Sequence, residues 1–135
     1  MDDCLFCKIV AGKIPAQKIY EDGHALAFLD IRPRSPGHTM VIPKEHAPTL
    51  VALPEAEVSP LFAAIKQVAD MLMKKLKPDG ITIGINQGRA SGQEVDHLHV
   101  HLIPRWHGDK GGPIQSIVNN PPSEPVEEIR KKILD

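Results

Sequence analysis

The chain has 135 residues, a length that suits one soluble domain with a single hydrophobic core. Its 16 lysines and arginines nearly balance its 17 aspartates and glutamates, so it lacks the positive field that would hold nucleic acid or an anionic membrane. The first residues lack the basic start and apolar run of a secretory signal, and no stretch is long and apolar enough to cross a bilayer. We therefore expect one cytoplasmic domain, residues 1–135, with neither nucleic acid nor membrane as a partner.

The first half of the chain predicts a short helix and three strands. Residues 5–11 are typical of a short helical turn. Residues 18–20 and 25–29 flank an Asp-Gly turn and predict a β-hairpin. Two prolines keep residues 30–37 from forming a helix or a central strand, so this loop leads to a third strand at residues 39–43.

The second half predicts one long helix and further strands. Apolar residues recur at three- and four-residue steps through residues 61–76, and Ser59 and Pro60 suit the cap and first position of a helix. Branched residues alternate through residues 81–86, which predicts a fourth strand, and residues 126–134 predict a last short helix. The predicted fold class is α+β: an antiparallel sheet of about five strands with one long helix and short terminal helices.

Three histidines at alternate positions form the most informative pattern in the chain: His97, His99 and His101. Side chains of a strand point to opposite faces at successive residues, so the three imidazoles would share one face. The opposite face would pack into the core through Leu98, Val100 and Leu102. An edge strand whose histidines merely face water is the alternative, but three histidines in strict alternation favour a functional surface.

Alternating imidazoles can divide the steps of phosphoryl chemistry between them. With an ordinary pKa of about 6.5, an unprotonated ring can attack phosphorus at neutral pH. A neighbouring ring can donate hydrogen bonds to the phosphate oxygens, and a third can orient the attacking ring. Histidines that hold a catalytic metal are the competing interpretation. Such sites usually recruit an acidic ligand, whereas Asp96 would point to the face opposite His97.

Cys4 and Cys7 have the Cys-x-x-Cys spacing with which two thiolates hold a tetrahedral zinc ion, with histidines as the remaining ligands. A redox dithiol uses the same spacing after a core strand, but only three residues precede Cys4. Two buried thiols without metal are a third interpretation. In a reducing compartment, both zinc ligation and free thiols are favoured over a structural disulfide.

Residues 97–103 resemble the His-x-His-x-His signature of the histidine triad superfamily of nucleotide hydrolases and transferases. Residues 37–46 resemble the third-strand motif of that family, residues 28–31 its ribose-side segment, and residues 92–95 its approach to the triad. These motifs lie in the order in which the family has them. The chain is most similar to Hint-like nucleotide-binding proteins of the bacterial type with an N-terminal zinc motif.

The resemblance implies a role for each matching residue. His99 would be the nucleophile that takes up a nucleoside monophosphate, His101 would bind the phosphate, and His38 would complete the histidine cluster. Gln93 would join these catalytic residues and, with Asn86, hold phosphate or leaving-group atoms. The remaining implied contacts are Gly92 and Glu94 near the leaving group, Asp30 at the ribose hydroxyls, and an apolar slot for the base formed by Phe6, Ile9, Ile14, Phe28, Ile31 and Met40. Ordinary core packing is the alternative for each apolar residue.

The resemblance also implies the full ligand set of the zinc site. Zinc-bearing members of the superfamily pair the two cysteines with the residues that match His46 and His97. One zinc ion per chain would then be structural, since four protein ligands leave no open position for substrate. His99 and His101 would remain free for phosphate chemistry.

The activity implied is hydrolysis at the α-phosphorus of purine nucleoside phosphoramidates or related nucleotidyl compounds, through a covalent nucleotidyl-His99 intermediate. The partner would be AMP or an adenylyl derivative. Glu94 replaces the serine of animal Hint-like proteins, so dinucleoside polyphosphate hydrolysis and nucleotidyl transfer stay open. A nucleotide-sensing binding or scaffold protein is the alternative from another class. The resemblance further implies a homodimer and a core at about residues 4–105, followed by a tail at 106–135.

Overall fold

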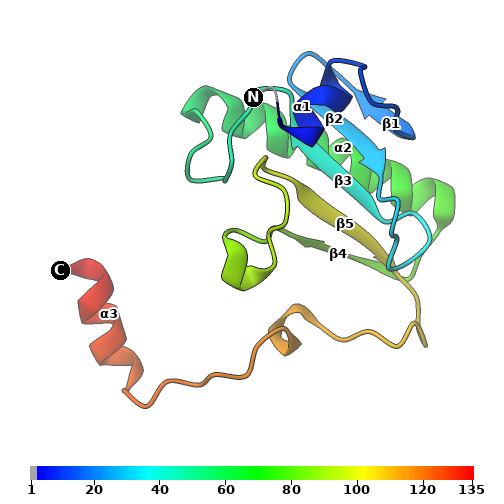
Figure 1. Ribbon diagram of the computed structural model, residues 1–135. Helices are drawn as coiled ribbons and strands as arrows, with labels where there is room; N and C mark the ends of the chain where they lie inside the picture. Colours follow the sequence, from blue (N-terminus) through cyan, green and yellow to red (C-terminus); the bar gives the residue numbers. More distant parts are fainter. Residues whose placement is uncertain (1–2) are drawn as a thin grey trace.

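The computed structural model describes residues 3–135. Met1 and Asp2, which open the segment used to argue against a secretory signal, lie outside the described residues. The helices and strands in chain order are α1 (Leu5–Val10), β1 (Lys18–Glu21), β2 (Ala25–Leu29), β3 (Thr39–Pro43), α2 (Glu55–Leu76), β4 (Gly80–Gly84), β5 (Val100–Arg105) and α3 (Val126–Leu134). All five strands form one antiparallel sheet in the order β1-β2-β3-β5-β4 (Figure 1). The predicted α+β fold is confirmed.

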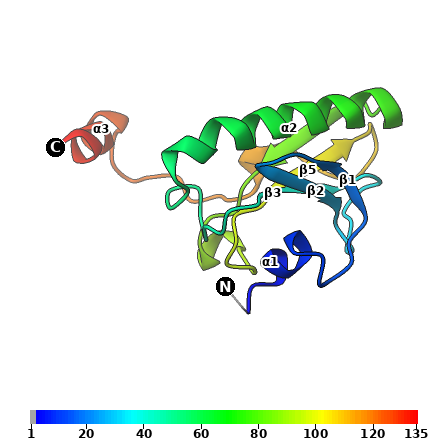
Figure 2. The same ribbon diagram turned by 90° about the horizontal axis from the view of Figure 1, so that it is seen from above.

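Helices α2 and α1 cover opposite faces of the sheet (Figure 2). The larger core lies under α2 and includes Leu61, Ile65, Val68, Leu72, Leu98, Val100 and Leu102. The smaller core lies under α1 and consists of Phe6, Ile9, Leu26, Phe28, Met40 and Ile42. The rings of His97 and His99 contact the Phe6 ring edge-on, on the α1 side. The predicted division, with the histidines on one face and the alternating apolar residues on the other, is confirmed.

Helix α2 begins earlier than its apolar periodicity predicted. It starts at Glu55 after Pro54, and Pro60 lies inside the helix instead of at its first position. The additional turn carries Glu55 and Glu57, whose carboxylates interact favourably with the positive end of the helix dipole. Pro60 has no N–H to donate to the preceding turn, so the helix tolerates one missing hydrogen bond. The prediction missed this turn because the turn is largely polar.

Strand β5 begins at Val100, so only His101 of the three alternating histidines lies within a strand. His101 is paired with Met40 of β3 on one side and with Gly84 of β4 on the other. The Leu98 N–H donates to the carbonyl of Ala47, 2.7 Å away, instead of to a strand. The alternation of side chains therefore extends beyond the ladder, because a loop supplies the hydrogen bond that a strand would otherwise make.

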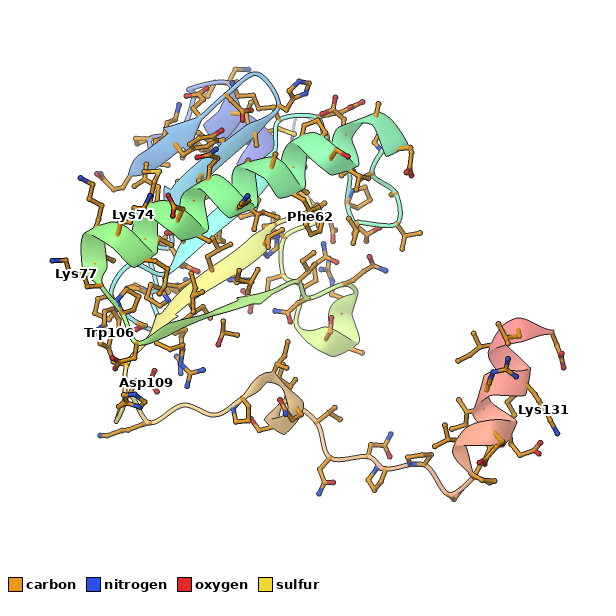
Figure 3. All side chains as sticks on the ribbon, turned by 180° about the vertical axis from the view of Figure 1, so that it is seen from behind. Phe62, Lys74, Lys77, Trp106, Asp109 and Lys131 are labelled. Atoms are coloured by element: carbon orange, nitrogen blue, oxygen red, sulfur yellow. The ribbon has the colours of Figure 1, made fainter. Side chains whose placement is uncertain are left out.

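The chain leaves the sheet through a turn that Asp109 closes. The Arg105 Nε group lies 2.7 Å from the Asp109 carboxylate, and the Trp106 N–H donates to the same oxygen at 3.1 Å. Trp106 and Asp109 lie where the chain leaves the sheet (Figure 3). No residue from 107 to 135 is buried, and α3 lies apart from the sheet (Figure 1). The predicted last helix is confirmed. Within residues 3–135, no helix has the length and apolarity needed to cross a membrane.

Candidate functional site

A cavity of about 510 Å³ opens on the α1 side of the sheet. Its walls come from α1, from the loop that joins β2 to β3, from residues between β4 and β5, and from two of the alternating histidines, His99 and His101. These segments are distant in sequence and meet because β3 lies between β2 and β5. The cavity therefore joins the predicted triad to three of the segments that resemble family motifs.

One wall of the cavity is apolar. Phe6 and Phe28 pack edge to face, with ring centroids 5.5 Å apart. The residues of this wall are largely buried and also belong to the smaller core or pack against it: Phe6, Ile9, Ile14, Phe28 and Met40. Ile31 differs, since it is 89% exposed and contributes only to the rim. All of these apolar residues except Ile31 therefore both pack in or against the smaller core and line the cavity.

Hydrogen bonds determine which nitrogen of His38 and of His101 carries the proton in the neutral rings. The Arg34 N–H can only donate, and it donates to His38 Nδ1 at 3.1 Å. The proton of neutral His38 therefore lies on Nε2, which is 2.9 Å from His101 Nδ1. His101 Nδ1 accepts this bond, so the remaining His101 N–H, on Nε2, is free to serve a ligand in the cavity that His101 lines.

The same argument applies to His97 and His99. His99 Nδ1 lies 2.8 Å from the carbonyl oxygen of His97, which can only accept, so Nδ1 carries the proton and Nε2 has a free lone pair. His97 Nε2 lies 2.9 Å from the carbonyl oxygen of Pro43, so its lone pair is on Nδ1. Among the three alternating rings, His99 lines the cavity with an unprotonated nitrogen to offer, as a nucleophile requires.

Burial keeps the rings of His38 and His101 neutral. Burial, together with the charges of His99 and His38, lowers the pKa of His101 from 6.5 to about 4, while Asp30 opposes the shift. Burial also lowers the pKa of His38, which Asp30 raises and the Arg34 guanidinium lowers further. Asp30 Oδ2 lies 3.6 Å from His38 Nε2. The two rings therefore hold the neutral tautomers described above at neutral pH.

We expect these pKa values to make the protein less stable in acid. Between the ordinary histidine pKa of 6.5 and about 4, an unfolded chain binds a proton at His101 that the folded chain does not. The free energy of unfolding should therefore fall as the pH is lowered from 6.5 toward 4. Denaturant unfolding at pH 7 and pH 5 should show a smaller difference for His101→Asn than for the parent. If the free energy of unfolding fell by the same amount in both proteins, the lowered pKa of His101 would be contradicted. Any destabilisation from protonation of the metal-binding residues occurs in both proteins and cancels in the comparison.

A second cluster lies at the other end of the histidine run. The donor atoms of Cys4, Cys7, His46 and His97 all lie within 4.8 Å of one another. His97 Nδ1, whose lone pair is free, is 3.3 Å from Cys4 Sγ, 3.5 Å from Cys7 Sγ and 3.2 Å from His46 Nδ1. Burial and the neighbouring Cys4 raise the pKa of Cys7 to about 11, so the protein alone disfavours the Cys7 thiolate.

The cluster has the dimensions of a tetrahedral zinc site. With bonds of about 2.3 Å to sulfur and 2.0–2.1 Å to nitrogen, a tetrahedron places two nitrogens about 3.3 Å apart, and sulfur about 3.5 Å from nitrogen. The distances in the cluster lie close to these values. A bound cation would also offset the cost of ionising the thiols. The residues present therefore fit zinc, and the four predicted ligands are brought together.

A comparison with known protein families matches residues 11–108 to the HIT domain. The chain belongs to the HIT family. The predicted resemblance to histidine triad proteins is confirmed, and the five-stranded sheet with one long helix is the fold that the structures of HIT proteins share with it.

Individual HIT proteins support this assignment. An uncharacterized HIT-like protein of Methanocaldococcus jannaschii is 50% identical over 106 residues, which cover 78% of this chain and 81% of that protein. The adenylylsulfatase HINT3 of Arabidopsis thaliana is 39% identical over 108 residues, which cover 80% of this chain and 55% of the plant protein. The crystal structure of a Zn-bound histidine triad family protein from Mycobacterium smegmatis is 44% identical, with a TM-score of 0.76, and the match covers 81% of this chain and 79% of that one.

The structure places Gln93 away from the cavity wall of this HIT protein. Gln93 is 4% exposed, and its amide nitrogen donates to the carbonyls of Pro48 and Val95 at 2.6 and 3.0 Å. Its amide oxygen accepts the Gly88 N–H at 2.9 Å. The side chain is therefore engaged in holding the loop before β5. In this state of the protein it is a positioning residue for that loop, without a free group for phosphate.

The other residues expected near phosphate, leaving group and ribose do line the cavity: Asp30, Asn86, Gly92 and Glu94. Gly92 has a φ of 102°, and an added Cβ would lie 3.9 Å from the Asn86 amide nitrogen, so its glycine identity follows from the backbone conformation. Glu94 also faces a second hollow beside Cys4 and His46. Glu94 thus lines both the cavity and the hollow beside the candidate zinc ligands.

Two charged residues of the cavity wall were not predicted from the sequence, Arg32 and Arg34. They belong to the proline-containing loop that was expected only to lead to the third strand. Their position between two segments that resemble HIT motifs, residues 28–31 and 37–46, is the signal that could have found them.

Asp30 was expected at the ribose alone, yet Asp30, His38 and His101 also form a second group of close donor atoms. Within this group, His38 Nε2 carries a proton and donates it in a hydrogen bond to His101 Nδ1, so these two nitrogens do not offer free lone pairs to a metal.

Proposed function

We propose that the protein is a nucleotide hydrolase that acts at the α-phosphorus of purine nucleoside phosphoramidates or related adenylyl compounds. The observation that carries the proposal is the orientation of His99. Its Nδ1 proton is held by the His97 carbonyl, so the unprotonated Nε2 is the nitrogen left for a substrate in the cavity. Imidazole in this tautomer is a nucleophile for phosphorus at neutral pH.

The reaction proceeds in two displacements. In the first, the lone pair of His99 Nε2 forms a bond to the α-phosphorus while the bond to the leaving group breaks, and the leaving group takes up a proton from solvent and departs as an amine or its equivalent. In the second, water attacks the same phosphorus and gives up one proton to solvent, the phosphorus–nitrogen bond breaks and a nucleoside monophosphate is released. His99 then returns to its neutral form.

The neighbouring residues stabilise and orient the reacting groups. His101 donates a hydrogen bond from its Nε2–H to a phosphate oxygen. His38 maintains this tautomer of His101 by donating a hydrogen bond to His101 Nδ1. Asn86 and Gly92 hold the phosphate, and Glu94 lies beside the leaving group. Asp30 accepts hydrogen bonds from ribose hydroxyls, and the apolar wall around Phe6 and Phe28 contacts the base. The relative named an adenylylsulfatase supports an adenylyl group as the part of the substrate that is bound.

One zinc ion per chain is part of the proposal. Cys4, Cys7, His46 and His97 would hold it, and when bound it supplies a structural crosslink between α1 and the approach to β5. His97 connects the zinc ligands to the cavity, because its carbonyl accepts the hydrogen bond that orients the His99 ring. The Zn-bound relative from Mycobacterium smegmatis supports this assignment.

We also propose a homodimer. Strand β4 is at the edge of the sheet, and its Ile83 is 42% exposed. An unpaired edge with an exposed apolar residue suits pairing with a second copy, which would continue the sheet across a two-fold axis.

The test is the detection of the covalent intermediate. Intact mass measured after brief mixing with adenosine 5′-phosphoramidate should show a nucleotidyl adduct on the parent protein and on His107→Ala, a variant of an exposed histidine outside the cavity. His99→Ala should form no adduct. Nucleotide binding without adduct or turnover in the parent would overturn the hydrolase and favour a nucleotide-sensing protein.

A further inference from the structure

Two arginines line the cavity beside Asp30. Arg32 and Arg34 are exposed residues of the loop between β2 and β3, and both contribute to the cavity wall. Among the ion pairs of residues 3–135, none involves either arginine. Two guanidinium groups without a carboxylate partner at the rim of a cavity are available to an anionic ligand.

Backbone hydrogen bonds hold the loop residues 32 and 34 against Asp30 and His38. The Arg32 N–H donates to Asp30 Oδ1 at 2.8 Å, and the Arg34 N–H donates to His38 Nδ1 at 3.1 Å. The charge of Arg34 also contributes, after burial, to the low pKa of His38. The two arginines therefore belong to the part of the cavity wall that also contains Asp30 and His38, and the Arg34 charge acts on the His38 ring.

The Glu94 side of the cavity adjoins an acidic hollow. Glu94 lines the cavity and also a second hollow of about 420 Å³. The hollow is also lined by two further carboxylate residues, Asp3 and Asp96, and by two candidate zinc ligands, Cys4 and His46. Anionic groups extending toward Glu94 would meet carboxylates, whereas anionic groups extending past Asp30 would meet Arg32 and Arg34. The charge distribution favours an extra anion at the Asp30 end.

We propose that Arg32 and Arg34 form a second anion site, which accepts a phosphate carried on the 2′ or 3′ oxygen of the ribose of the bound nucleotide. The inference rests on the proposed function, because that function assigns Asp30 to the ribose. In nucleotide-binding folds a carboxylate holds a free ribose hydroxyl, and an arginine nearby accommodates a ribose phosphate. Asp30 would then hold the hydroxyl that stays free, and the arginines would bind the phosphate on the other oxygen. The preferred substrate class is thus an adenylyl compound with a ribose phosphomonoester.

The test compares four nucleotides by calorimetric titration of the full chain: AMP, ADP, adenosine 2′,5′-bisphosphate and adenosine 3′,5′-bisphosphate. One of the two ribose bisphosphates should bind about tenfold more tightly than AMP, the gain expected from charge-assisted hydrogen bonds to one added phosphate. The identity of that bisphosphate distinguishes the 2′ from the 3′ position. In the Arg32→Gln/Arg34→Gln variant, the ratio of the dissociation constants of AMP and that bisphosphate should fall toward one.

Arg130→Gln is the matched control, because Arg130 is an exposed residue of α3 outside the cavity. This variant should keep the parental ratio. Bisphosphates that bind no more tightly than AMP would overturn the inference and leave the proposed function standing. A gain for ADP without a gain for either bisphosphate would place the anion at the leaving-group end and would also overturn it. Failure of all four nucleotides to bind would overturn the proposed function and the inference together.

Discussion

His99→Ala is expected to lower the rate of adenosine 5′-phosphoramidate hydrolysis by about four orders of magnitude or more, because removal of a nucleophile removes the covalent route. The neighbouring rings cannot replace it. The lone pair of His101 Nδ1 accepts a hydrogen bond from His38, and His97 Nδ1 lies among the cysteine and histidine ligand atoms of the candidate zinc site. The measurement is the single-turnover rate with excess enzyme, which reports the chemical step.

The matched variant is His107→Ala, which removes an exposed histidine outside the cavity and should keep the parental rate. Circular dichroism and AMP titration of His99→Ala distinguish lost chemistry from a lost fold or a lost cavity. Turnover by a folded His99→Ala protein within tenfold of the parent would contradict the nucleophile. Restoration of the rate by added imidazole would identify the missing ring as its cause.

Removal of zinc is expected to destabilise the protein strongly. If free zinc stands at about 1,000 times the dissociation constant, binding contributes about 4 kcal/mol to the free energy of unfolding. For a chain of this size that corresponds to a fall in Tm of roughly 10–15 °C on chelation. Thermal unfolding with and without chelator, together with the zinc content of the purified protein, measures the effect.

Ligand variants separate the zinc effect from other effects of chelation. His46→Ala should have a low Tm that chelator hardly changes, whereas His24→Ala, a variant of a largely exposed histidine, should respond to chelator like the parent. Below its own Tm, the zinc-free protein should keep measurable turnover, since four protein ligands leave the ion no open position. Complete loss of turnover with the fold intact would instead favour a catalytic metal.

The sequence predicted those parts of the site that depend on local spacing. Alternation placed the rings of His97 and His99 on the face opposite Leu98, and Cys4 and Cys7 indicated zinc through their spacing. The resemblance to histidine triad proteins then supplied the residues that spacing alone could not connect. His46 is one of these, and its donor atom lies 3.3 Å from Cys7 Sγ.

The sequence left the environment of two residues open, because their residue types suit more than one environment. An amide at residue 93 suits phosphate, but neighbouring backbone groups engage both ends of Gln93. Ile31 suits a base slot, but it lies at the rim because its loop leaves the sheet. Asp96 was expected to point away from His97, and the carboxylate that lies near a histidine of the cavity is that of Asp30, 3.6 Å from His38 Nε2. These environments depend on tertiary contacts that periodicity cannot specify.

By itself, then, the sequence determined which side chains share a face and which could bind metal or attack phosphorus, because the period of a strand and the spacing of cysteines are local properties. Only the tertiary structure decided which histidine nitrogen carries each proton. That depends on two local groups, the Arg34 N–H and the His97 carbonyl, and on two groups from distant segments, the Pro43 carbonyl at His97 and the His38 ring at His101. They meet the histidines because β3 packs directly against β5 in the sheet.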